Sequence, residues 1–111
     1  MSLVLDRSLY PAVPVTFRQD GGIDWEAQKA YARWMATQPI SGVALWAHTG
    51  RGLLLSSQDR KAVFQVWREA LGTNKQIICG VGSRGADTAE GFTEAAYQMG
   101  IEAKTLGADG I

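Results

Sequence analysis

Three short apolar runs, spaced roughly thirty to thirty-five residues apart, constrain most strongly what this chain can fold into. They are residues 12–17 (AVPVTF), 42–46 (GVALW) and 76–81 (QIICGV). The last two runs show no alternation of apolar and polar residues, which is typical of parallel strands covered by helices on both faces. We therefore predict three parallel strands. Pro14 is expected at a point where the ladder is interrupted, because proline donates no backbone hydrogen bond.

The segments between these runs have helical patterns. The first helix is expected to follow an N-cap at Asp24, and the second an N-cap at Ser56, where Ser56 and Asp59 form a variant of the capping box. The third helix is expected to begin near Asp87 or Thr88. The stripes predicted to face the core are Trp25, Ala27, Ala30, Tyr31 and Trp34; Val63, Val66, Trp67, Ala70 and Leu71; and Phe92, Ala96, Met99, Ala103 and Leu106.

The predicted elements alternate as βαβαβα, and residues 108–111 (ADGI) are the expected approach to a fourth strand. This spacing is typical of repeated βα units in a parallel α/β sheet. A (β/α)₈ barrel needs about 250 residues, whereas the chain has 111. We therefore expect residues 1–111 to be the N-terminal portion of a single (β/α)₈ TIM barrel domain, a fragment of a longer chain.

Charge and composition exclude several classes of partner. The 11 Lys and Arg residues balance the 11 Asp and Glu residues, which argues against nucleic acid. No apolar run approaches the roughly 18 residues of a membrane helix, and the N-terminus has no secretory pattern. The single cysteine, Cys79, excludes an internal disulfide and fits a reducing compartment. We expect a cytoplasmic protein that binds neither nucleic acid nor membrane.

Functional groups of parallel sheets gather in the loops after the strands, here residues 18–22, 47–52 and 82–85. The second loop (AHTGRG) holds the only histidine, His48, beside Thr49. The Thr49 hydroxyl and the amides next to the glycines could hold a carboxylate. The alternative is a glycine-rich turn with a solvent-facing histidine.

Residues 80–85 (GVGSRG) match the G-x-G-x-x-G pattern of dinucleotide-binding domains. That pattern also needs an acidic residue about 20 positions on, at the end of the next strand. Glu102 has the spacing but lies inside a predicted helix, and Asp109 precedes its strand. A dinucleotide-binding domain, with Gly80, Gly82 and Gly85 at its phosphate loop, is kept as an alternative hypothesis.

The lysines and the cysteine are not placed for catalysis. Lys29, Lys61 and Lys104 fall on helices away from the core stripes, and Lys75 precedes the third strand at its wrong end. Cys79 lies inside a predicted buried strand, where packing is the expected role. No His, Cys and carboxylate residues have metal-ligand spacing, so we predict neither a metal nor a cofactor.

An ordered set of short motifs runs through most of the chain. They are residues 15–17 (VTF), 20–21 (DG), 23–24 (ID), 47–51 (AHTGR), 55–56 (LS), 59–60 (DR), 80–82 (GVG) and 107–109 (GAD). In this order and at this spacing they resemble the N-terminal part of the dihydrodipicolinate synthase/N-acetylneuraminate lyase family of class I aldolases.

The resemblance implies an enzyme that makes or breaks carbon–carbon bonds of 2-oxo acids, usually pyruvate, through a lysine Schiff base in a (β/α)₈ barrel. It also implies a homotetramer. Carried over by position, Thr49 matches the second of the family's paired threonines and, with Gly50, would bind the carboxylate of the oxo acid. His48 stands at the relay position of the first threonine, and Arg51 replaces a glutamate.

The lysine and the tyrosine that the resemblance requires are expected beyond residue 111. The fragment alone is therefore expected to be inactive. A relative that binds an oxo acid as a sensor, without turning it over, is a further alternative suggested by His48.

Overall fold

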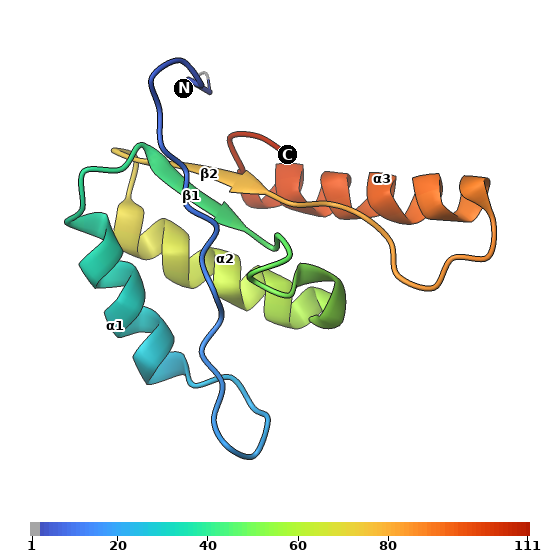
Figure 1. Cartoon of the computed structure of the whole chain (residues 1–111), viewed down its shortest axis with the longest axis horizontal. Helices are drawn as coiled ribbons and strands as arrows, with labels where there is room; N and C mark the ends of the chain where they lie inside the picture. Colours follow the sequence, from blue (N-terminus) through green and yellow to red (C-terminus); the bar gives the residue numbers. More distant parts are fainter. Residues whose placement is uncertain (1–2) are drawn as a thin grey trace.

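Two parallel strands, β1 (Gly42–Leu45) and β2 (Gln76–Cys79), form the centre of the molecule. In this computed structural model, which describes residues 3–111, both arrows point the same way (Figure 1). Gly42 pairs with Gln76, and Leu45 pairs with Cys79. The predicted parallel strands at 42–46 and 76–81 are confirmed, although each ends one or two residues earlier than expected.

The strand predicted over residues 12–17 does not form as such. The segment is extended and lies beside β1, but it makes only one bridge to it, between Ala12 and Ala44. Val13 N–H donates to the Ala44 carbonyl at 3.2 Å. The ladder stops there because the next partner on the β1 side, Trp46, leaves the extended conformation with a φ of +58°. Pro14 thus lies where the ladder is interrupted, as expected.

Three α-helices and one short 3₁₀-helix complete the fold. They are α1 (Trp25–Ala36), η1 (Gly52–Leu54), α2 (Ser57–Leu71) and α3 (Ala89–Leu106). The N-caps are Asp24, Ser56 and Thr88, each of which accepts a hydrogen bond from the backbone N–H three residues later. The predicted helix starts are therefore confirmed. Helices α1 and α2 lie along one side of the sheet, and α3 extends along the other end of the molecule (Figure 1).

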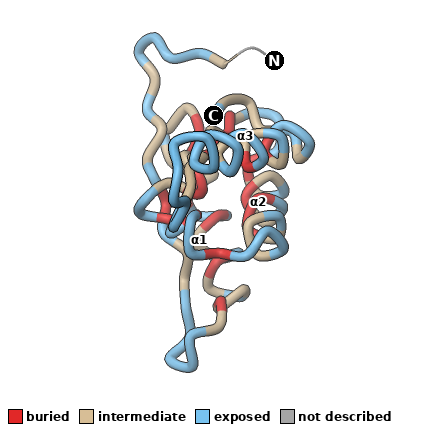
Figure 2. Tube along the Cα trace, turned by 90° about the vertical axis from the view of Figure 1, so that its right-hand side faces the viewer, coloured by how far each residue is buried: buried red, intermediate tan, exposed pale blue. Residues whose placement is uncertain are grey.

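The core lies between the sheet and the helices, and α2 has buried residues along its length (Figure 2). Trp67 of α2 is fully buried. Two of the predicted stripes are partly wrong. Trp34 is 58% exposed and Ala30 is also exposed, whereas Gln28 is fully buried on α1. Phe92 is 50% exposed, because the first turns of α3 project beyond the sheet.

The burial of Gln28 has a clear polar cause. Its side-chain oxygen accepts a hydrogen bond from the Thr16 N–H at 2.9 Å, and its side-chain nitrogen donates to the Pro14 carbonyl at 3.5 Å. The glutamine thus satisfies backbone groups of residues 12–17 that no ladder satisfies. Gln28 therefore faces the core with Ala32 and Met35, whereas the apolar pattern predicted Ala30 and Trp34 there.

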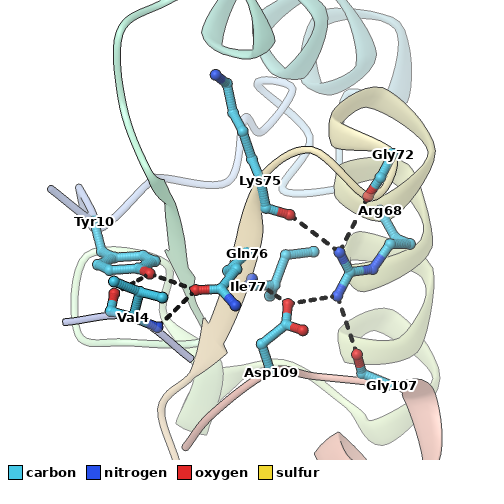
Figure 3. Close-up of polar contacts among 9 residues, drawn as sticks. All are labelled: Val4, Tyr10, Arg68, Gly72, Lys75, Gln76, Ile77, Gly107 and Asp109. Carbon is cyan, nitrogen blue, oxygen red and sulfur yellow. Dashed lines mark hydrogen bonds and ion pairs between the residues drawn. The ribbon is translucent and has the colours of Figure 1, made fainter. Parts of the chain in front are cut away.

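Residues 108–111 approach the second edge of β2, as predicted for the entry to a further strand. Gly110 bridges Ile78 in parallel. Figure 3 shows the Asp109 carboxylate accepting hydrogen bonds from the Ile77 N–H at 2.8 Å and from Arg68 at 3.0 Å. Arg68 also donates to the Gly107 carbonyl at 3.0 Å. This cluster fixes the amino-terminal end of the sheet, opposite the loops that follow β1 and β2.

Candidate functional site

A cleft of about 770 Å³ opens at the carboxyl ends of β1 and β2. One wall comes from the loop after β1, with Trp46 and His48, and from η1, with Leu53. The other comes from the loop after β2, with Val81 and Arg84. The cleft therefore lies at the edge of a parallel sheet where binding groups gather in α/β folds.

The loop after β1 turns sharply through two residues in the left-handed region. Trp46 has a φ of +58° and Arg51 a φ of +53°. The turn is closed by the Arg51 N–H, which donates to the His48 carbonyl at 3.1 Å. Residues other than glycine adopt this conformation at a cost, and such strain persists where the surrounding structure holds it in place. The indole N–H of Trp46 donates to the Arg60 carbonyl at 3.1 Å, and this contact anchors the turn on α2.

Glycines allow the two loops to meet. A Cβ atom on Gly52 would lie 2.1 Å from the Trp46 carbonyl oxygen, and one on Gly80 would lie 2.9 Å from the same atom. Both distances are too short for a side chain. The absence of a side chain at Gly52 therefore lets the loop after β1 fold back on itself, and its absence at Gly80 lets the two loops meet.

The three predicted site residues lie in the same turn but in different surroundings. His48 is exposed and lines the cleft. Thr49 is also exposed, but it is not among the residues that line the cleft. Gly50 is buried beside the first segment, where a Cβ atom would lie 3.0 Å from the Val13 carbonyl oxygen. Thr49 and Gly50 thus flank the cleft, and His48 faces it.

Sequence reasoning missed the arginines. Arg51 and Arg84 both line the cleft, together with Trp46. The sequence offered one signal for each arginine. Arg51 stands where the family that the chain resembles has glutamate, and Arg84 lies in the loop after the third predicted strand.

The glycine-rich loop after β2 does not open a helix directly. Helix α3 begins at Ala89, four residues after Gly85, and its N-cap is Thr88. A dinucleotide fingerprint places its last glycine in the first turn of the helix, so that the helix N-terminus faces the pyrophosphate. This geometry argues against the dinucleotide hypothesis.

The lysines and Cys79 have the surroundings that their positions predicted. Lys29, Lys61 and Lys104 are exposed on helices, and Lys75 is half-buried just before β2. Cys79 is fully buried, and burial raises the pKa of its thiol to about 12, so it remains protonated and unreactive near neutral pH. Within residues 3–111, no three His, Cys, Asp or Glu side chains are grouped so that they could hold a metal ion.

None of the helices within residues 3–111 is long and apolar enough to cross a membrane.

The Dihydrodipicolinate synthetase family matches the chain over residues 6–106. The chain belongs to this family. The predicted family is thereby confirmed, and because the family and its structural neighbours are aldolases and lyases, the chain carries the fold of a lyase family.

Solved structures show the same fold. N-acetylneuraminate lyase from Mycoplasma synoviae is 27% identical with a TM-score of 0.73, covering 92% of this chain and 33% of that one. Dihydrodipicolinate synthase from Aquifex aeolicus is 20% identical with a TM-score of 0.75, covering 93% of this chain and 32% of that one. The chain thus spans about a third of the length of these proteins, which agrees with the predicted part of a (β/α)₈ barrel.

Proposed function

We propose that the protein to which these residues belong makes or breaks a carbon–carbon bond of a 2-oxo acid, such as pyruvate, through a lysine Schiff base. One observation carries the proposal: in a chain of the Dihydrodipicolinate synthetase family, His48 faces a cleft at the carboxyl ends of two parallel strands. We also propose a cytoplasmic homotetramer. The free, buried thiol of Cys79 supports a reducing compartment.

We assign the substrate carboxylate to Thr49 and Gly50. The Thr49 side chain is exposed and makes no hydrogen bond within residues 3–111, so its hydroxyl is free to donate to a ligand. A hydroxyl and a backbone amide are the donors that bind carboxylates without a full charge. Since Thr49 lies beside the cleft, its role requires the carboxylate to bind at the rim.

We assign the proton relay to His48. An imidazole gains and loses a proton near neutral pH, which the threonine hydroxyl that it replaces does not do. His48 can therefore carry a proton between the bound oxo acid and solvent. His48→Gln removes the imidazole and keeps a polar side chain, so loss of turnover with retained substrate binding is the expected result in the full protein.

We propose further that residues 1–111 alone have no lyase activity. A Schiff-base lysine must reach the carboxyl ends of the strands, in a site dry enough to lower its pKa. The four lysines lie on helix surfaces or before β2. No lysine of this chain is therefore placed to form the Schiff base.

Borohydride reduction tests both parts of the proposal. With pyruvate and borohydride, the 111-residue chain should keep its mass, and the full-length protein should gain one reduced pyruvate on a lysine outside residues 1–111. A pyruvate adduct on the chain itself would contradict its proposed inactivity. A full-length protein that binds pyruvate without forming an adduct would instead support the oxo-acid sensor, which the exchange of threonine for His48 suggests.

A further inference from the structure

The cleft has a basic lining that the proposed chemistry does not use. Three of its lining residues, His48, Arg51 and Arg84, carry cationic or titratable nitrogen groups. Within residues 3–111, the lining includes no Asp or Glu. A 2-oxo monocarboxylate needs only one anion-binding position, which the proposed function assigns to Thr49 and Gly50. The two guanidinium groups are therefore available for a second anionic group.

The two arginines at the cleft are not paired with carboxylates, whereas three of the other arginines are. Arg18, Arg60 and Arg68 each form an ion pair at 2.9–3.2 Å. Among the residues that the structure describes, Arg51 and Arg84 form none. In a chain whose formal net charge is zero, two uncompensated guanidinium groups on one cleft give it a positive potential.

The backbone and a ring contact hold Arg51 at the cleft. Two hydrogen bonds hold its backbone in the left-handed conformation. The Arg51 N–H donates to the His48 carbonyl, and the Arg51 carbonyl accepts from the Leu54 N–H at 2.9 Å. The guanidinium carbon lies 5.7 Å from the centroid of the Phe17 ring. The ring contact limits the positions of the side chain without neutralising its charge.

We propose that the cleft selects a 2-oxo acid with a second carboxylate, which Arg51 and Arg84 bind. The proposal rests on the function proposed above and specifies its substrate class. A planar guanidinium matches a carboxylate in a two-point contact. Thr49 and Gly50 bind the carboxylate next to the oxo group, and the arginines bind the distal one.

Three five-carbon acids separate the contributions. 2-Oxoglutarate has both carboxylates and the oxo group, 2-oxopentanoate lacks the distal carboxylate, and glutarate lacks the oxo group. Titrations of the full-length protein, followed by calorimetry, should show 2-oxoglutarate binding about tenfold tighter than 2-oxopentanoate. One charge-assisted hydrogen bond supplies a factor of about that size.

Two substitutions and one matched control test the assignment. Arg51→Gln and Arg84→Gln should each remove most of the preference for 2-oxoglutarate while leaving the affinity for 2-oxopentanoate unchanged. Arg33→Gln removes another arginine that forms no ion pair within residues 3–111, on α1 and outside the lining of the cleft, and should change neither affinity.

The outcomes distinguish this inference from the proposed function. Equal affinities for 2-oxoglutarate and 2-oxopentanoate would overturn the inference and leave the proposed function standing. Binding of glutarate as tight as that of 2-oxoglutarate, without binding of 2-oxopentanoate, would support the arginine site and overturn the oxo-acid function. If the full-length protein binds none of the three acids, both are overturned.

Discussion

At Gly52 the turn after β1 leaves no space for a side chain. A Cβ atom there would lie 2.1 Å from the Trp46 carbonyl oxygen, and backbone has to move to accept it. We expect Gly52→Ala to lower the free energy of unfolding by about 1–3 kcal/mol, as overpacking does. Gly82→Ala is the control from the facing loop, because its Cβ would meet only Leu53 at an ordinary 3.5 Å. Urea unfolding of both variants should show a clearly lower free energy of unfolding for Gly52→Ala and little change for Gly82→Ala.

Cys79 links the stability of the fold to pH. Burial raises the pKa of its thiol from 9.0 to about 12. The folded chain therefore holds this proton more tightly than the unfolded chain does. The buried thiol therefore makes its full contribution to the free energy of unfolding below about pH 9. This contribution falls as the pH rises toward 12, by at most about 1.4 kcal/mol per pH unit.

The matched variant for this prediction is Cys79→Ala, which lacks the titrating group. Between about pH 8 and pH 10, the wild-type chain should lose roughly 1 kcal/mol more of its free energy of unfolding than Cys79→Ala does. Denaturant titrations of both proteins at the two pH values measure these free energies of unfolding. Identical pH dependence in the two proteins would show that the thiol is not buried as described.

Among the elements, the segment that follows α3 depends on a polar contact. Asp109 is 15% exposed at its side chain and accepts from both Arg68 and the Ile77 N–H (Figure 3). We expect Asp109→Asn to cost about 1.5–3 kcal/mol, since it weakens hydrogen bonds to a charged, partly buried group. Hydrogen exchange should show faster opening of β2 and of residues 108–111.

Asp20→Asn is the comparison for this variant. Asp20 pairs with Arg18 at 3.2 Å, but both side chains are more than half exposed. Exposed pairs contribute about 0–1 kcal/mol, so this change should leave the unfolding curve nearly unmoved. Equal effects of the two substitutions would mean that the cluster around Asp109 does not hold the sheet edge.

The helices and the two central strands followed from local sequence signals, whereas the first strand and the buried face of α1 did not. Capping residues such as Ser56 act on their own helix and are visible in the sequence. Gln28 is buried because it serves the backbone of Thr16 and Pro14, a contact between elements that apolar periodicity cannot encode. The long-range polar contact decided the packing there.

The site was predictable in place but only partly in detail. The rule that loops gather at the carboxyl ends of parallel strands located both loops of the cleft. The side chains that line it depend on the left-handed conformations of Trp46 and Arg51, which neither residue type signals. Arg51 therefore reached the lining while Thr49, two residues earlier, did not.

At the scale of the whole molecule, apolar surface remains uncovered along α3. Tyr97 and Ile101 are 61% and 42% exposed, and with Ile111 they line a second cleft of about 330 Å³. Exposed apolar patches promote association. We expect the 111-residue chain to self-associate as its concentration rises, and Ile101→Lys to reduce that association by placing a charge in the patch.

Sedimentation over a range of concentrations measures this effect. Trp34→Lys is the matched control, because Trp34 is also a large exposed apolar residue, at 58%, but lies on α1, at the far end of the molecule from α3 (Figure 1). The α3 patch predicts that only Ile101→Lys shifts the chain toward monomer. If Trp34→Lys does so instead, the associating surface is on α1, and the uncovered face of α3 has no part in it. The same experiment on the full-length protein should show no effect of Ile101→Lys on association if the rest of the barrel covers this face.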